Sequence, residues 1–413
     1  MHPYLRRRNK EEPVSYPSPA VKQVLERTLG VSIFQEQVMQ LAMVAAGFSP
    51  GEADQLRRAM AAWKRKGGLG PFRDKLINGM LANGYSETYA EQIYQQIQGF
   101  GEYGFPESHS ASFALLVYLS AWLKCHEPAA FACAMLNSQP LGFYTASQLV
   151  QDAQRHNVIV RPLDIARSEW DCTLERSDGG EPILRLGLRM VKGLSEAAAL
   201  RIVAARTHIT DVDDLARKAK LDRRELSCLA KADALASLAG HRRNALWETL
   251  GFDPPTELLL DAKRSEPQAD LFPPSEGQDI VADYAHTGLT LRRHPLTLLR
   301  NKLSAQKMLT ATDLKQIPHG HRIRIAGIVT GRQRPGTASG VTFVTLEDET
   351  GYSNIVVWRS LADKQRQVLL GASLMGVDGI VERKGEVIHV IAKRLSDHSR
   401  LLGKLVIESR DFH

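Results

Sequence analysis

Apolar residues at helical spacing dominate the first third of the chain. They recur three and four positions apart over Val21–Leu29 and Phe34–Ala46, a pattern that predicts amphipathic helices. The segment Ser49–Glu52 is a turn that places a carboxylate in the first turn of a further helix, which is a normal helix start. Residues 1–140 are therefore predicted to form a mainly helical domain.

The middle block, residues 141–310, mixes short elements of both kinds. A β-like stretch over Val158–Pro162 and a short strand over Ile183–Leu188 are followed by two short helical pairs. A polar segment with prolines, Ser265–Gln278, breaks the pattern and predicts an exposed loop or linker.

The third block, residues 311–395, alternates apolar and polar positions as strands do. A helix-like stretch over Ser360–Leu370 interrupts the alternation. Five short strands with an inserted helix favour a small closed barrel of the oligonucleotide-binding (OB) kind, and residues 396–413 are left as a C-terminal tail. The fold class is thus multidomain α+β, with helical regions before a five-stranded barrel. The predicted strands cover Arg322–Thr330, Val341–Leu346, Asn354–Trp358, Leu374–Glu382 and Glu386–Ala392.

Composition narrows the class of protein. The 413 residues are 43% hydrophobic and 24% charged, which excludes a disordered chain. The longest apolar run, Ala111–Leu123, is too short to cross a bilayer, and the N-terminus lacks the apolar stretch of a secretory signal. Four cysteines without a CxxC pair indicate a reducing, cytoplasmic setting. A net charge of +7 and a pI near 9.2 favour a polyanionic partner.

Sequence matches to common catalytic and metal-binding motifs lack the neighbouring elements or the residue spacing that those sites need. The GxGxxG match at Gly99–Gly104 follows a glutamine-rich helix instead of the strand that a dinucleotide site needs. The cysteines and histidines lack zinc spacing. The acidic residues Asp211, Asp213 and Asp214 precede a helix, where carboxylates usually act as caps and dipole partners. Similarly, Glu347–Glu349 is interpreted as a hairpin turn. We therefore predict no catalytic residue and no metal site within this chain.

Two basic features suit phosphate binding. One is a cluster that includes Arg57, Arg58 and the run Lys64–Lys66; it is either a solvated face or a site where paired guanidinium groups bind phosphate. The other is the stretch Val191–Ser195, which is typical of the turn in a helix-hairpin-helix, where backbone amides reach a DNA phosphate. Ser195 stands in place of the usual second glycine, so a DNA-binding and a purely structural hairpin both remain open.

The linker also contains an apolar pair. Leu271 and Phe272 end the sequence QADLF inside a polar segment. They act either as an anchor that folds back onto the neighbouring domain, or as a short peptide that docks into a partner's pocket, with Gln268 bonding at the rim.

Three long stretches of the chain resemble one family. They are similar to bacterial C-family DNA polymerases, relatives of the DNA polymerase III alpha subunit. The three stretches are FQEQVMQLAMVAAGFSPGEADQLRRAM, GFGEYGFPESHSASFALLVYLSAWLKCHEPAAF and AGIVTGRQRPGTASGVTFVTLEDETG. The sequence of the barrel segment and the terminal SRDFH resemble the error-prone, damage-inducible branch. The resemblance covers essentially the whole chain.

This resemblance implies an order of domains and a role for particular residues. It implies part of the fingers at residues 1–140, a helix-hairpin-helix and clamp-binding region at 141–310, and the OB barrel at 311–395. The family's palm, which holds Mg²⁺ through carboxylates, and its phosphatase-like domain lie upstream and are not in this sequence. Arg57 and Arg58 match the family's pair that contacts the incoming triphosphate. QADLF matches its internal sliding-clamp motif, giving Gln268, Leu271 and Phe272 as clamp-binding residues.

The resulting hypothesis is the C-terminal part of an error-prone DNA polymerase for damage-induced translesion synthesis. Its expected partners are primer-template DNA, deoxynucleoside triphosphates, the sliding clamp and other mutagenesis proteins, with no membrane. Two alternatives stay open: a non-catalytic module that binds DNA and the clamp, and a truncated, inactive remnant. The residues expected to bind DNA are Lys64, Arg65, Lys66, Lys192, Gly193, Arg322, Arg324, Arg332 and Arg334.

Overall fold

The protein divides into two compact units. The computed structural model describes residues 3–66, 70–100, 105–142, 144–252, 271–335, 340–405 and 410–412. Contacts along the chain separate Met1–Trp122 from Leu123–His413. The expected class is confirmed, because helical regions precede a closed barrel. The expected domain limits near residues 140 and 310 stay predictions.

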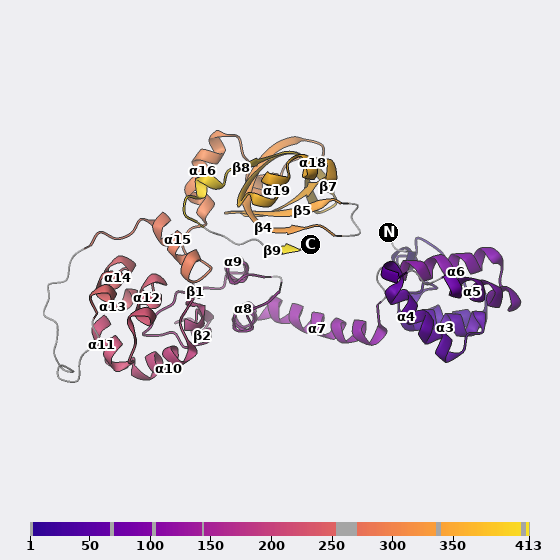
Figure 1. Ribbon diagram of the computed structural model, residues 1–413, viewed down its shortest axis with the longest axis horizontal. Coiled ribbons are helices and arrows are strands. Elements are labelled where there is room, and N and C mark those ends of the chain that lie inside the picture. The colour runs from indigo at the N-terminus through magenta and orange to yellow at the C-terminus, as the bar shows by residue number, and fades with distance from the viewer. Residues whose placement is uncertain are drawn as a thin grey trace. The chain divides into compact units, whose positions relative to one another are not determined.

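The first unit is helical (Figure 1). The predicted helices over Val21–Leu29 and Phe34–Ala46 are confirmed as α2, continued by a 3-10 turn, and as α3. A Cβ atom on Gly79 would lie 2.2 Å from the Ala46 carbonyl oxygen, so α5 passes α3 at a distance that only glycine permits. The helices are α1 (Pro3–Arg8), α2 (Pro19–Leu25), α3 (Gln35–Ala46), α4 (Pro50–Lys66), α5 (Gly70–Ala82), α6 (Glu87–Phe100) and α7 (Glu107–His126), the last continuing into the second unit.

The apolar run identified in the sequence lies in α7. This helix has no buried residue. Across the described part of the chain, no helix combines the length and the apolar character needed to cross a membrane.

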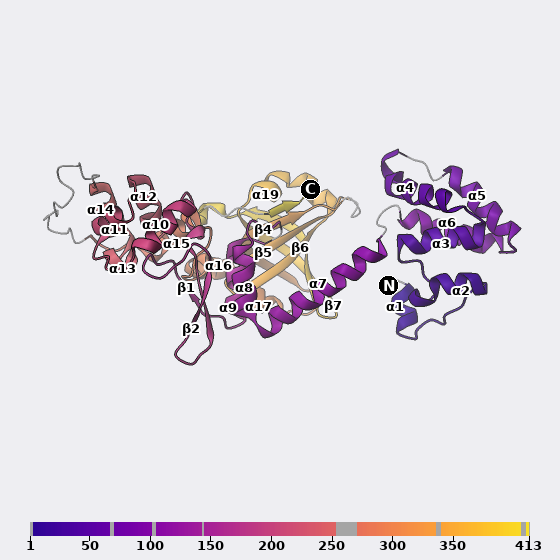
Figure 2. The same cartoon turned by 90° about the horizontal axis from the view of Figure 1, so that it is seen from below.

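The second unit begins with helices around a small sheet. The strand order is β1-β3-β2, and β2 was not expected from the sequence. Figure 2 shows β2 in a hairpin that projects beside the helices. These elements are α8 (Pro128–Asn137), α9 (Ala146–Arg155), β1 (Val160–Arg161), β2 (Thr173–Arg176), β3 (Pro182–Arg185), the 3-10 turn η2 (Leu188–Met190), α10 (Glu196–Ala205), α11 (Val212–Lys218), α12 (Arg223–Lys231), α13 (Ala236–Ala239) and α14 (Arg242–Gly251).

The barrel follows three connecting helices. Its order is β5-β6-β8-β7-β4, and a β4–β5 pairing closes it. The pair β6–β8 is parallel, and β9 was not expected from the sequence. The elements are α15 (Glu276–His286), α16 (Pro295–Ala305), α17 (Ala311–Leu314), β4 (Arg322–Gln333), β5 (Thr342–Asp348), β6 (Gly351–Val357), α18 (Arg359–Lys364), α19 (Arg366–Gly371), β7 (Leu374–Lys384), β8 (Val387–Asp397) and β9 (Arg410–Phe412).

The end of β5 joins the barrel to the helices. A hairpin does connect β5 and β6, but of the predicted turn residues only Glu349 lies in the turn, because Glu347 and Asp348 pair with β6 as the last residues of β5. Glu347 is only 5% exposed. Its carboxylate accepts hydrogen bonds from Gln151 of α9 at 2.8 Å and from Nε2 of His294 at 3.2 Å. The His294 Nδ1 atom accepts from the Leu296 amide, so a neutral ring donates through Nε2. Burial acts to raise the pKa of Glu347, but these bonds outweigh it and hold the pKa below its ordinary value.

The Glu347 contacts predict a loss of stability in acid. A carboxyl group with a lowered folded-state pKa stabilises the fold above the ordinary value of 4.5, and this contribution disappears as the pH falls below it. We expect Glu347→Gln to flatten the decline in the free energy of unfolding between about pH 6 and about pH 3. Urea unfolding measures this. Glu386→Gln, at an exposed position, is the matched control and should leave the wild-type decline intact.

Candidate nucleic-acid interface

The two arginines expected to bind triphosphate lie next to each other on α4. Asp54 accepts from Arg57 Nε at 3.0 Å and Nη2 at 2.8 Å, and it pairs with Arg58 Nε at 2.8 Å. The hydrogen bond from Arg57, with help from Arg58, lowers the pKa of Asp54. The Arg57 side chain is 39% exposed and the Arg58 side chain 75%. One carboxylate thus fixes both guanidinium groups near the surface, in an arrangement able to receive an anion.

The remaining basic residues of α4 are placed only by their backbone. Lys64, Arg65 and Lys66 form its last turn, and their side chains lie outside the described residues. Their role in DNA binding stays a prediction.

The hairpin turn is well defined, but its lysine faces the protein. Gly193 has φ +86, and a Cβ atom there would lie 3.2 Å from Cys228 Sγ. The Lys192 amide donates to the His286 carbonyl at 2.9 Å, and its Nζ donates to the Tyr284 carbonyl at 3.3 Å. Ser195 caps α10 by accepting from the Ala198 amide at 3.1 Å. Lys192 therefore bonds to the end of α15, an arrangement that favours the structural interpretation of this hairpin.

The barrel arginines have three different environments. Arg324 pairs with Asp378 at 2.7 Å and donates to the Gln306 carbonyl at 3.0 Å, while Arg322 is exposed at the start of the same strand. Arg332 is only 7% exposed and donates to the Leu369 and Ala372 carbonyls, both at 2.6 Å. These bonds satisfy carbonyls at the end of α19, so Arg332 has a structural role and we do not assign it to DNA.

Two exposed aromatic residues near the end of β4 were missed by sequence reasoning, and one of them, Phe343, pairs with Gln333, the residue before Arg334. Phe343 pairs with Val356 across β5 and β6. Because side chains alternate along a strand, Phe343 and Trp358 lie on one face, opposite to the core residues Val344 and Val357. Phe343 is 38% exposed and Trp358 is 54% exposed.

Two arginine side chains pass close to Gly340, just before β5. A Cβ atom on Gly340 would lie 3.1 Å from Arg359 Cδ and 3.5 Å from Arg334 Nη2. The Arg359 side chain is 71% exposed and pairs with Asp363 at 3.7 Å. We call Arg334, Phe343, Trp358 and Arg359 the barrel patch. Exposed rings next to exposed cations are the combination that binds single-stranded nucleic acid, through base stacking and phosphate contacts.

The sequence contained the signal for this patch. Phe343 stands at an outward position of the alternating run VTFVTL, where an exposed aromatic residue is unusual. Trp358 and Arg359 follow the next strand directly.

The acidic residues do not form a metal site. Asp211 caps α11 by accepting from the Asp214 amide at 2.7 Å, as the sequence predicts. Among the residues that the structure describes, no group of three or more His, Cys, Asp or Glu side chains is arranged to hold a metal ion.

Of the proposed clamp-binding residues, two are placed. Gln268 lies outside the described residues. Leu271 is half-buried, and Phe272 is 85% exposed.

Three family models match separate parts of the chain. Residues 1–84 match the bacterial DNA polymerase III alpha subunit finger domain. Residues 157–245 match a helix-hairpin-helix motif, and residues 323–397 match an OB-fold nucleic acid binding domain.

Curated relatives match the entire chain. An error-prone DNA polymerase of Alkalilimnicola ehrlichii is 61% identical over an alignment of 415 positions that covers 100% of this chain and 40% of the relative. Those of Methylococcus capsulatus and Pseudomonas fluorescens are 57% and 58% identical, each over 100% of this chain and 41% of the relative. The chain thus spans about 40% of the length of the curated relatives it matches.

A solved structure also resembles the chain over a short region. Asparaginyl-tRNA synthetase from Pyrococcus horikoshii matches over 22% of each chain, with 22% identity and a TM-score of 0.18, a likeness too slight to bear on function. The finger, helix-hairpin-helix and OB matches occur in the order expected from the sequence, and the whole-chain identity agrees with them. The chain therefore belongs to the bacterial C-family DNA polymerases, within the error-prone branch related to the DNA polymerase III alpha subunit.

Proposed function

We propose that this chain is the C-terminal portion of an error-prone DNA polymerase that extends primers past damaged template positions during damage-induced mutagenesis. The observation that carries the proposal is the 61% identity to an error-prone DNA polymerase along the whole chain. The reaction is nucleotidyl transfer, in which the primer's terminal hydroxyl attacks the incoming triphosphate and pyrophosphate leaves.

The chain's own residues position the reactants. Arg57 and Arg58, held by a shared carboxylate on α4, bind the triphosphate oxygens of the incoming nucleotide. The barrel patch stacks on unpaired bases and contacts their phosphates. The turn at Gly193 supports the helix-hairpin-helix region structurally, because Lys192 bonds to the end of α15, and we assign it no direct phosphate contact.

Mg²⁺ is the metal ion we expect, and the described residues do not fit it. No described group of side chains has the ligands for it, so we assign its ligands to the family's palm. The proposed partners are primer-template DNA, deoxynucleoside triphosphates, the sliding clamp and other mutagenesis proteins. Contact with the clamp would run through QADLF.

A second candidate function is a non-catalytic module that binds DNA and the clamp. The observation that favours it is the same lack of a metal-binding group among the described side chains, since phosphate contacts and stacking need no catalytic carboxylate. An inactive remnant is the third alternative.

Reconstitution tests the proposal. We expect no primer extension with Mg²⁺ and four deoxynucleotides from this chain alone, and extension when it is mixed with the remaining part of the Alkalilimnicola ehrlichii enzyme. In that mixture, Arg57→Ala with Arg58→Ala should raise the nucleotide KM by roughly a hundredfold or more, because each of the two charge-assisted bonds contributes about 1.5–3 kcal/mol.

The control removes two arginines elsewhere. Arg167 and Arg176 are exposed in the second unit, and their double alanine variant should keep the wild-type KM. An unchanged KM in the Arg57/Arg58 variant would remove the triphosphate role. No primer extension by the folded mixture would favour the non-catalytic module.

A further inference from the structure

The segment Leu271–Ser275 displays an apolar side chain to solvent. Phe272 is 85% exposed, the largest fraction among the large apolar side chains of the described residues. A phenylalanine in that position contributes almost nothing to burial within the fold. Its backbone, by contrast, is held on both sides.

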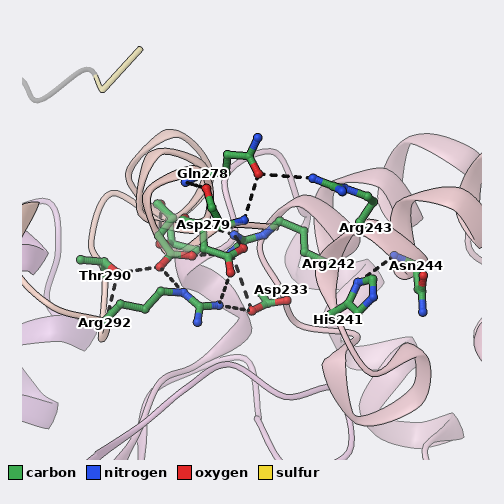
Figure 3. Close-up of polar contacts among 12 residues, drawn as sticks. Asp233, His241, Arg242, Arg243, Asn244, Gln278, Asp279, Thr290 and Arg292 are labelled. Atoms are coloured by element: carbon green, nitrogen blue, oxygen red, sulfur yellow. Dashed lines mark hydrogen bonds and ion pairs between the residues drawn. The ribbon is translucent and has the colours of Figure 1, made fainter. Parts of the chain in front are cut away.

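Two side chains of the α14 amino terminus hold the backbone. His241 Nε2 lies 2.9 Å from the Leu271 carbonyl oxygen, and Arg243 Nη1 donates to the Phe272 carbonyl at 2.7 Å. The His241 Nδ1 atom accepts from the Asn244 amide at 3.2 Å (Figure 3), so the ring proton is on Nε2 and points at Leu271. One histidine thus caps the helix and holds the segment.

The following residues stiffen the segment. Pro273 and Pro274 fix their own φ angles, and Pro273 restricts Phe272 to extended backbone. Ser275 and Gln278 then form a capping box at the start of α15. The Gln278 side-chain oxygen also accepts from Arg243 Nη2 at 3.3 Å, so Arg243 contacts both the segment and the capping box that follows it (Figure 3).

Buried ion pairs fix the two helices that carry these contacts. Arg242 on α14 pairs with Asp279 and Asp283 on α15. Arg292 contacts Asp233 at 2.8 Å and Asp279 at 3.2 Å (Figure 3). We call these five residues the aspartate–arginine cluster. It sets α14 against α15, and it therefore sets the position from which His241 and Arg243 reach the segment.

We propose that His241 and Arg243 are positioning residues for a preformed docking peptide, whose Phe272 side chain enters an apolar pocket on the sliding clamp. This inference rests on the clamp contact proposed above. Holding the backbone before binding removes part of the ordering cost of association. Carbonyl-directed bonds leave the Phe272 ring outward, as insertion into a pocket requires.

Surface plasmon resonance on an immobilised bacterial sliding clamp tests the proposal. Phe272→Ala should weaken binding by at least about 30-fold, as for an anchor residue. His241→Asn keeps a good helix cap but cannot reach Leu271, and Arg243→Gln removes the bond to Phe272. Each should weaken binding by about three- to tenfold. A free peptide of residues 266–276 should bind no better than the double variant His241→Asn/Arg243→Gln.

Controls separate positioning from folding and from charge. Arg224→Gln removes an equal charge at an exposed position of α12 and should bind as wild type, while Arg243→Lys retains a donor and should recover part of the affinity. All variants should keep the wild-type circular dichroism melting curve. If Phe272→Ala loses affinity for the clamp but the His241→Asn/Arg243→Gln double variant binds as wild type, the positioning role would be overturned and the clamp contact would stand. Absence of wild-type binding, or unaffected binding by Phe272→Ala, would overturn the clamp contact and the positioning with it.

Discussion

Replacing Arg242 by alanine should lower the free energy of unfolding of the α14–α15 region by about 3–5 kcal/mol, the usual cost of leaving a buried charge without its partner. The Arg242 side chain is 5% exposed, and those of Asp279 and Asp283 are 12% and 13% exposed. Without Arg242, Arg292 would be the one arginine left to two carboxylates that are almost out of water, with Thr290 donating a hydrogen bond to Asp283 at 2.6 Å. That arginine is 36% exposed and lies 3.2 Å and 3.5 Å from them, so it cannot replace the lost contacts.

Asp233→Asn is the matched variant, because the cluster holds three aspartates and two arginines. Burial raises the pKa of Asp233 although Arg242 and Arg292 oppose it. A carboxyl group with a raised folded-state pKa opposes folding above that pKa, and the penalty is relieved as the pH falls through it. Asp233→Asn should therefore be neutral or stabilising at pH 7, opposite to Arg242→Ala.

Urea titration followed by hydrogen exchange of the α14 amides measures both changes in the region itself. Arg224→Ala, at an exposed position of α12, should shift the transition by less than about 0.5 kcal/mol. Equal, small effects of Arg242→Ala and Arg224→Ala would mean that the cluster adds nothing to the packing of α14 on α15.

The barrel was predictable from the sequence because its strands bury one face each. Alternation located all five strands, with bounds a few residues off, and the chain reverses between β5 and β6 at Glu349 and Thr350. Alternation did not reveal that Arg332, which was expected to bind DNA, faces inward. The register of β4 shifts between Val329 and Gly331, and such a bulge reverses the alternation beyond it. Arg332 therefore faces inward, although it has the same parity as the exposed Arg322.

The docking segment shows a different limit. The sequence identified Leu271 and Phe272 because apolar residues are unusual in a polar linker. It gave no sign of His241 or Arg243, which bond to the segment from 30 and 29 positions away. Those contacts depend on how α14 packs against α15. That packing is fixed by ion pairs between residues 37 and 41 positions apart, and no local pattern reports them.

The barrel patch predicts a large and selective loss of single-strand binding. Stacking contributes about 1–3 kcal/mol per base, so Phe343→Ala with Trp358→Ala should weaken the affinity for an unstructured oligonucleotide by about 30-fold or more. Fluorescence anisotropy with a labelled single strand measures this. A duplex of the same length should lose much less, because its bases are already stacked within the helix and present no free face to the rings.

Trp247→Ala controls for the loss of an exposed ring, because Trp247 is 56% exposed and belongs to α14, outside the barrel. It should leave single-strand affinity unchanged. Arg334→Gln with Arg359→Gln should act differently from the aromatic variant. For single strands, each lost phosphate contact lowers the slope of log affinity against log salt by about 0.7, whereas removing the rings should leave that slope intact. Equal losses for single strand and duplex in the aromatic variant would contradict stacking. A change of salt slope with the aromatic variant would indicate that the rings act by holding Arg334 and Arg359 in place, and the bases would then have no direct partner on this face.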